Sequence, residues 1–98
     1  MVEKIEHEFV CVVWADAHEG EGSWSPLDPD DQQEHLVHTV GMLITDDQGG
    51  KARHVTIAQS KSPNDFYDHV IHIPVAMIRS ICFLKAFTKD IAVDPLTV

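Results

Sequence analysis

Seven histidines are the first residues whose chemistry could make a site, because the neutral imidazole binds metals and carries protons. Two pairs are spaced three residues apart, His35 with His38 and His69 with His72. Residues three apart share a face on a helix but point to opposite sides of a strand. The first pair could therefore chelate at a helix end, whereas the second lies in a predicted strand and could not. Zinc sites need three or four ligands and no cysteine pair accompanies these histidines, so we expect no metal site.

Carboxylates are dense in two stretches, residues 16–21 and residues 28–31. Neither fits the calcium-binding loop, which needs glycine at its sixth position; Gln33 stands there when Asp28 is counted first. We interpret both as solvated acidic loops. The sequence also lacks a G-x-S-x-G motif and a phosphate-binding glycine loop after a strand. We therefore expect no catalytic residues, no cofactor and no enzymatic activity, and a metal-dependent enzyme is the least favoured function.

Bases, amide donors and aromatic rings interleave in only one part of the chain. Bases can meet phosphate, and an aromatic or imidazole ring can stack on a nucleobase. This pattern predicts a site for a nucleotide or a single strand of nucleic acid, the alternative being a solvated hairpin tip. The candidate binding residues are Lys51, Arg53, His54, Lys61, Asn64, Tyr67 and His72.

The net charge of −9 is concentrated in the first third of the chain. Residues 1–34 hold ten of the sixteen acidic residues and a single base, Lys4, so the remainder is neutral. A strongly acidic protein repels nucleic acid at long range. Any polyanion must therefore bind a local basic patch, and we expect that binding to depend on salt.

The elements that must position these residues are short strands rich in β-branched residues. Between two of the strands, 46–51 reads as a turn and makes a hairpin, with Gly49-Gly50 supplying positive φ. Gly41 predicts a bulge or sharp bend. A short helix is expected at 29–36, because Asp28 can cap it and proline suits the first helical position. The predicted strands are 9–14, 37–46, 53–59, 69–74 and 79–85, the last preceded by one turn at 75–78.

Strands without long helical crossovers predict an antiparallel meander, and at 98 residues a strongly bent, five-stranded SH3-like barrel. We expect one domain over residues 1–98, with a barrel core at about 9–87 and a loose tail at 88–98. Trp24, an aromatic in a polar loop, is expected to cover the core. Cys11 and Cys82 lie in apolar runs and are expected to be reduced core residues.

Targeting signals are absent from the sequence. No run of 18 apolar residues could span a membrane, and the acidic start lacks the apolar region of a secretory signal. We therefore expect a soluble protein that stays in the cytoplasm.

Two segments resemble the motifs of the Sm/LSm family of RNA-associated proteins. Residues 40–46, VGMLITD, resemble the Gly-x-Leu…Asp part of the first Sm motif. Residues 71–81, IHIPVAMIRSI, occupy the place of the second motif, although Pro74-Val75-Ala76 stands where the family has Arg-Gly-Asn or Arg-Gly-Asp. The resemblance implies an Sm-like barrel over about 9–84 that assembles into a homo-oligomeric ring and binds nucleic acid.

The chain also resembles small phage proteins of unknown function, notably from cyanophages. The shared features are Val13-Trp14-Ala15-Asp16, Trp24, Thr39-Val40-Gly41 and the Ile-Pro-x-x-x-Ile segment at 73–78. This resemblance implies a phage-encoded protein acting in the host cytoplasm. The expected function is thus a ring-forming protein that binds RNA, single-stranded DNA or nucleotides. Two alternatives stay open: a protein that sequesters a small nucleotide signal, and an interaction module that uses the acidic first third.

Overall fold

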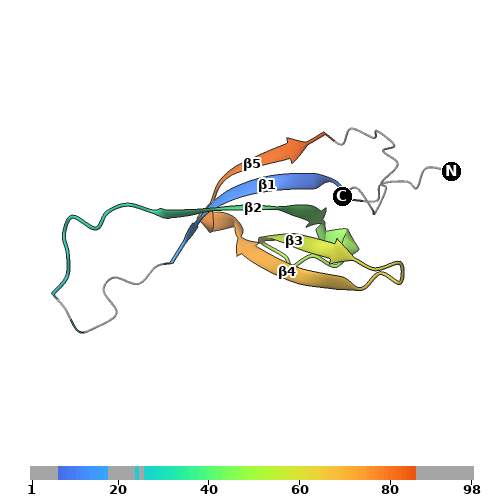
Figure 1. Cartoon of the computed structure of the whole chain (residues 1–98), viewed down its shortest axis with the longest axis horizontal. Helices are drawn as coiled ribbons and strands as arrows, with labels where there is room; N and C mark the ends of the chain where they lie inside the picture. The colour runs from blue at the N-terminus through green and yellow to red at the C-terminus, as the bar shows by residue number, and fades with distance from the viewer. Residues whose placement is uncertain (1–6, 18–23, 25, 86–98) are drawn as a thin grey trace, which may run out of the picture.

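The computed structural model of the protein describes residues 7–17, 24 and 26–85 (Figure 1). Within them the regular secondary structure is mainly β, with five antiparallel strands in one open sheet and only two short 3₁₀ turns. The strands are β1 (Phe9–Asp16), β2 (His35–Ile44), β3 (His54–Lys61), β4 (Tyr67–Pro74) and β5 (Ile78–Leu84), and the 3₁₀ turns are η1 (Asp46–Gln48) and η2 (Val75–Met77). The five predicted strands, the hairpin and the turn before the last strand are confirmed. No helix in the described part of the chain is long and apolar enough to cross a membrane.

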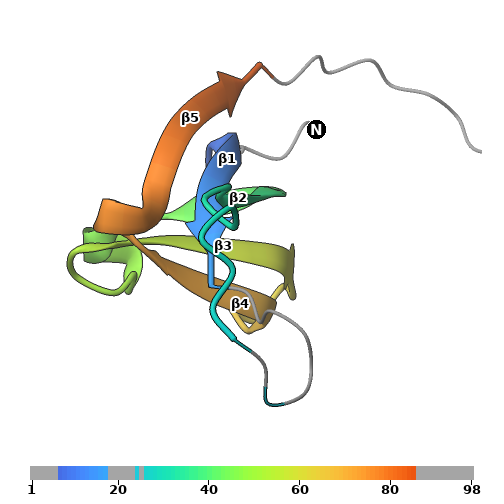
Figure 2. The ribbon, with the colours of Figure 1, turned by 90° about the vertical axis from the view of Figure 1, so that its left-hand side faces the viewer.

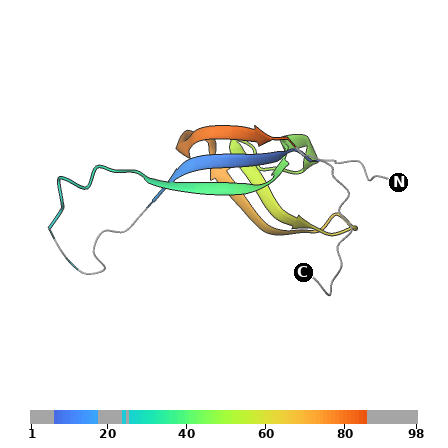
Figure 3. The ribbon, with the colours of Figure 1, turned by 45° about the horizontal axis from the view of Figure 1, so that its top comes forward.

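The strand order is β4-β3-β2-β1-β5, so the first strand lies between the second and the last. β1 pairs with β2 along its whole length, from Phe9 opposite Met42 to Asp16 opposite His35. β2 meets β3 over only three residue pairs, whereas β3 and β4 form a long ribbon. Figures 2 and 3 show the sheet folding over, so that β3 and β4 lie beneath β1 and β2.

The core fills the space under this fold. Its fully buried side chains are Val10 and Val12 from β1, Ile57 from β3 and Ile73 from β4. Their spacing by two along β1 follows the strand rule that alternate side chains share one face. Partly buried side chains surround this cluster: Trp14, Leu43, Val55, Ile71 and Ile78.

Gly41 lies in β2 where this strand comes close to the backbone of β3. A Cβ at this position would stand 2.6 Å from Ile57 Cγ2 and 2.7 Å from the Ala58 carbonyl oxygen. The glycine therefore permits an approach of the two backbones that no other residue allows. Of the two glycines in the turn at 46–51, only Gly49 has positive φ, at 107°.

The helix predicted at 29–36 is wrong. The Asp28 side chain does accept a bond from the Asp30 amide (2.9 Å), but its carbonyl then accepts from the Asp31 amide (3.1 Å), which closes a single turn. All side chains from 28 to 34 are exposed, so a helix would gain no buried face, and so short a helix is unstable alone. His35 already belongs to β2.

Two expectations about burial are also wrong. Trp24 is 106% exposed and covers no part of the core. Cys82 is exposed and Cys11 is only half-buried, and both thiols are free. Both cysteines lie on the sheet face opposite to Val10 and Val12, so their apolar neighbours in sequence do not bury them. The predicted tail at 88–98 lies outside the described residues.

Candidate nucleotide or nucleic-acid interface

The seven predicted binding residues fall into two groups at opposite ends of β3. Lys51, Arg53 and His54 precede or begin the strand, whereas Lys61, Asn64 and Tyr67 end or follow it. The seven residue steps from His54 to Lys61 span about 23 Å at roughly 3.3 Å per residue. A mononucleotide cannot contact both groups, so they are two separate surfaces.

His72 belongs to the first group, through Thr56. Thr56 and His72 face each other across β3 and β4, and Thr56 Oγ1 lies 2.8 Å from His72 Nδ1. The same hydroxyl oxygen accepts a bond from the Lys51 amide at 3.0 Å. Thr56 is 2% exposed, so a buried hydroxyl fixes both the Lys51 backbone and the His72 ring. We call Lys51, Arg53, His54 and His72 the β3-start surface.

Arg53 is held in an unusual backbone conformation. Its φ is 61°, in the left-handed region that non-glycine residues seldom adopt and that clusters at functional sites. Its carbonyl accepts a bond from the Val75 amide at 3.2 Å, which ties this turn to η2. Next to it, His54 Nδ1 donates to the Ala52 carbonyl at 2.8 Å. The carbonyl can only accept, so Nε2 of neutral His54 is left as an acceptor.

The cationic side chains of the β3-start surface are available to a ligand. Lys51 and Arg53 are exposed, and no other residue in the described ranges pairs with their side-chain charges. Two carboxylates lie close in sequence, Asp46 and Asp47 of η1, both exposed. The surface thus presents two cations and two imidazoles, which suits a small anionic group and weak, salt-sensitive binding.

The second group is already engaged within the protein. Lys61 Nζ forms an ion pair with Asp65 at 3.0 Å, and Asn64 is exposed in the following turn. The Tyr67 hydroxyl lies 2.9 Å from His7 Nε2, with the two rings edge to face at 5.7 Å. Tyr67 is therefore part of an internal contact and less suited to stacking on a base.

His7, which the sequence did not single out, links three distant segments. It is 7% exposed, and its Nδ1 lies 3.2 Å from Gln48 Oε1. That oxygen also accepts from the Thr45 amide, which fixes its orientation, so His7 Nδ1 must donate. In neutral His7, Nε2 then accepts from the Tyr67 hydroxyl. The partners lie 41 and 60 residues away, a separation at which sequence spacing carries no signal.

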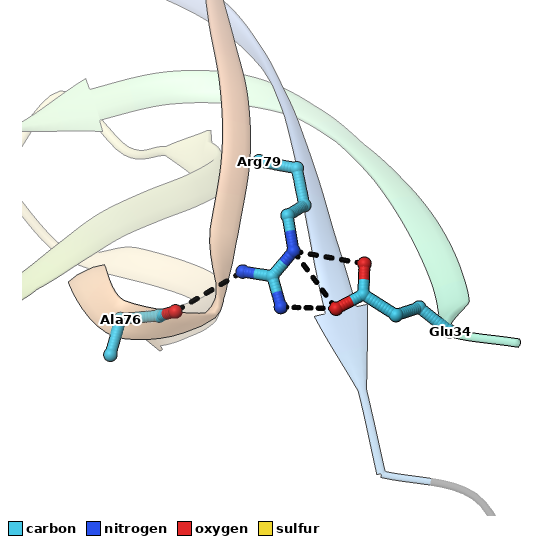
Figure 4. Close-up of polar contacts among 3 residues, drawn as sticks. All are labelled: Glu34, Ala76 and Arg79. Carbon is cyan, nitrogen blue, oxygen red and sulfur yellow. Dashed lines mark hydrogen bonds and ion pairs between the residues drawn. The ribbon is translucent and has the colours of Figure 1, made fainter. Parts of the chain in front are cut away.

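Arg79 forms a second long-range contact that the sequence did not reveal (Figure 4). Its guanidinium donates to both oxygens of Glu34 and, through Nη1, to the Ala76 carbonyl at 3.1 Å. The hydrogen bonds lower the pKa of the Glu34 carboxyl below its ordinary value and raise the pKa of Arg79. This pair joins the residue before β2 to the start of β5.

The histidine pairs form no metal site in the described part of the chain. His35 and His38 both lie on β2, where residues three apart point to opposite faces, so the helix-end chelate we considered is wrong. His69 lies in β4 with φ 51° and contacts Asp68 at 3.1 Å. Among the described residues, no three histidine, cysteine or acidic side chains gather as a metal site would require.

No family model matches the chain, and neither the curated proteins nor the solved structures include a match. The function must therefore be inferred from the contacts above.

Proposed function

We propose that the protein is a non-enzymatic, phage-type Sm-like protein that closes into a small barrel, assembles into a homo-oligomeric ring, and binds RNA, single-stranded DNA or nucleotides. The β3-start surface is the proposed binding site. One observation carries this assignment: the side chains of Lys51 and Arg53 are exposed, pair with no other described residue, and lie beside two imidazoles held by hydrogen bonds. Cations with flat rings are what phosphate and base recognition require.

Assembly is supported by the sheet edges and by β5. β4 and β5 end the sheet, and each has one edge that no described strand pairs with. Ile81 and Phe83 lie directly opposite Val12 and Val10 and so share the core face, yet they are 41% and 58% exposed. Barrel closure and a neighbouring copy would cover these side chains and the free edges, which otherwise favour uncontrolled pairing.

The first experiment is native mass spectrometry of the purified protein, repeated under denaturing conditions. A single closed oligomer with additional mass that is lost on denaturation is the expected result, and the lost mass identifies the ligand. A bare monomer would contradict the ring, and the acidic interaction module would become the better hypothesis.

The binding site is tested with the double variant Lys51→Gln/Arg53→Gln. Its affinity for a single-stranded oligonucleotide should fall, and the slope of log K against log salt should shrink by about 1.4, because two phosphate contacts are removed at roughly 0.7 each. Lys85→Gln, which removes an exposed charge at the end of β5, is the control and should bind normally. Lys61→Gln tests the far end of β3. Unchanged binding and an unchanged slope in the double variant would refute the site.

A second candidate function is favoured by the small number of cations on the β3-start surface, which are Lys51 and Arg53. Two exposed bases on a protein of net charge −9 suit a short anionic ligand better than a long strand. In that case the protein sequesters a small nucleotide signal. Co-purification of a nucleotide, together with failure to bind long single strands, distinguishes this function from nucleic-acid binding.

A further inference from the structure

Two thiols face each other across the pair of strands formed by β1 and β5. Cys11 and Cys82 are directly opposite in the antiparallel register, between the pairs Val10 with Phe83 and Val12 with Ile81. The only irregularity between these strands lies further along, between Val13 and Trp14. Both thiols are free, with Cys82 exposed and Cys11 half-buried. Neither thiol belongs to the β3-start surface.

The register places these cysteines within reach of a covalent bond. Directly opposite residues on antiparallel strands project to the same face, with Cα atoms about 4.5 or 5.5 Å apart according to the type of pair. Disulfides accept Cα separations of about 4.4–6.8 Å. Either type of pair therefore permits a cross-strand disulfide after a small closing movement of the two Cβ atoms.

We propose that Cys11 and Cys82 form a reversible disulfide that fastens the edge strand β5 to β1 when the protein meets a disulfide oxidant such as oxidised glutathione. The exposed Cys82 thiolate attacks one sulfur of the oxidant and releases one reduced glutathione. The Cys11 thiolate then attacks the Cys82 sulfur of this mixed disulfide and releases the second. The protein loses two electrons and two thiol protons, and the oxidant is reduced to two thiols.

The bond has a large structural effect because of where it lies in the fold. β5 pairs with β1 alone among the described strands, so this ladder supplies all of its strand pairing, to which Arg79 adds its contact with Glu34. The disulfide also closes a loop from residue 11 to residue 82, and restricting so long a loop strongly limits the unfolded chain. The oxidised protein should therefore melt at a temperature higher by roughly ten degrees or more than the reduced protein.

The test is intact-mass spectrometry of the full chain after equilibration in glutathione buffers of graded oxidation, with alkylation of remaining thiols. The wild type should become two hydrogen atoms lighter, resist alkylation and revert in excess reduced glutathione. Cys82→Ser should retain one alkylatable thiol and show no rise in melting temperature under oxidising conditions.

The matched control moves one thiol by a single residue. The variant Cys82→Ser/Phe83→Cys keeps two cysteines but places the second on the opposite face of β5, where it cannot reach Cys11. It should give only glutathione adducts or disulfide-linked dimers. The proposal is overturned if the wild type also gives only adducts or linked dimers, or if the control closes an internal disulfide as readily as the wild type.

Discussion

The contact between His7 and Tyr67 gives the sharpest prediction, because a test of it shows whether Tyr67 stabilises the folded protein or contacts the ligand. Tyr67→Phe keeps the aromatic ring and removes only the hydroxyl that lies 2.9 Å from His7 Nε2. His7 is 93% buried, so its ring nitrogen would lose its partner without gaining water. Leaving a buried polar group unsatisfied costs about 1–3 kcal/mol.

The expected loss of unfolding free energy is therefore about 2 kcal/mol, which corresponds to a fall of roughly 8–16 °C in the melting temperature of a domain of this size. Urea denaturation followed by Trp14 fluorescence measures the former, and calorimetry the latter. Binding to the oligonucleotide, measured well below the melting temperature, should be unchanged.

A double variant provides the control for this prediction. In His7→Leu/Tyr67→Phe both partners are apolar, and Gln48 Oε1 still accepts from the Thr45 amide. The loss should therefore be smaller than the sum of the two single losses by about 0.5–3 kcal/mol. Additive losses would show that the hydroxyl and the imidazole do not interact. A Tyr67→Phe protein of normal stability that fails to bind would show that Tyr67 contacts the ligand.

Three further predictions concern single positions. Glu34→Gln should destabilise the protein by its full amount above the ordinary carboxyl pKa of about 4.3. Because Arg79 lowers the pKa of Glu34 in the folded state, this contribution declines as pH falls below that value through the lowered pKa, so urea titrations of the two proteins should differ most near neutral pH and approach each other in acid. Gly41→Ala should cost about 1–3 kcal/mol of unfolding free energy in urea titrations, because its Cβ would overlap the Ala58 carbonyl oxygen; normal stability would contradict the close approach of β2 to β3. Trp24→Ala should change the unfolding free energy by less than about 0.5 kcal/mol, since the side chain is fully exposed, and a larger loss would mean that Trp24 does cover the core.

The strands could be predicted because their signal is local. Runs rich in valine, such as residues 10–13, indicate a buried strand, and Gly41 within a strand indicates a close approach of another backbone. The prediction of a helix at 29–36 was wrong because a capping residue and a proline favour the start of a helix but do not provide an apolar face that packing could bury. The prediction that Trp24 covers the core was wrong for a related reason. The apolar character of a side chain shows that it can be buried, but does not show that the backbone places it near the core.

The candidate site was harder to predict, since spatial proximity depends on register. Lys51 and Lys61 are ten residues apart in sequence, yet β3 extends between them and keeps them far apart. Conversely, His7 meets Tyr67, and Arg79 meets Glu34, across 60 and 45 residues. Such contacts follow from the order of the strands in the sheet and from the way the sheet folds over, which no spacing rule in one sequence reveals.

The pairing of β1 with β5 also governs how the chain can fold. Phe9 lies opposite Leu84, which is 75 residues later in the chain (84 minus 9). The second edge of β1, the strand that supplies Val10 and Val12 to the core, therefore stays unpaired until that distant segment is in place. Closing such a long loop lowers the chain entropy before the free energy of the new contacts compensates for it, and chains dominated by distant pairings fold slowly. The hairpin of β3 and β4 can form early, whereas β1 remains an exposed apolar strand until synthesis reaches β5. During that interval the nascent chain is most prone to aggregate.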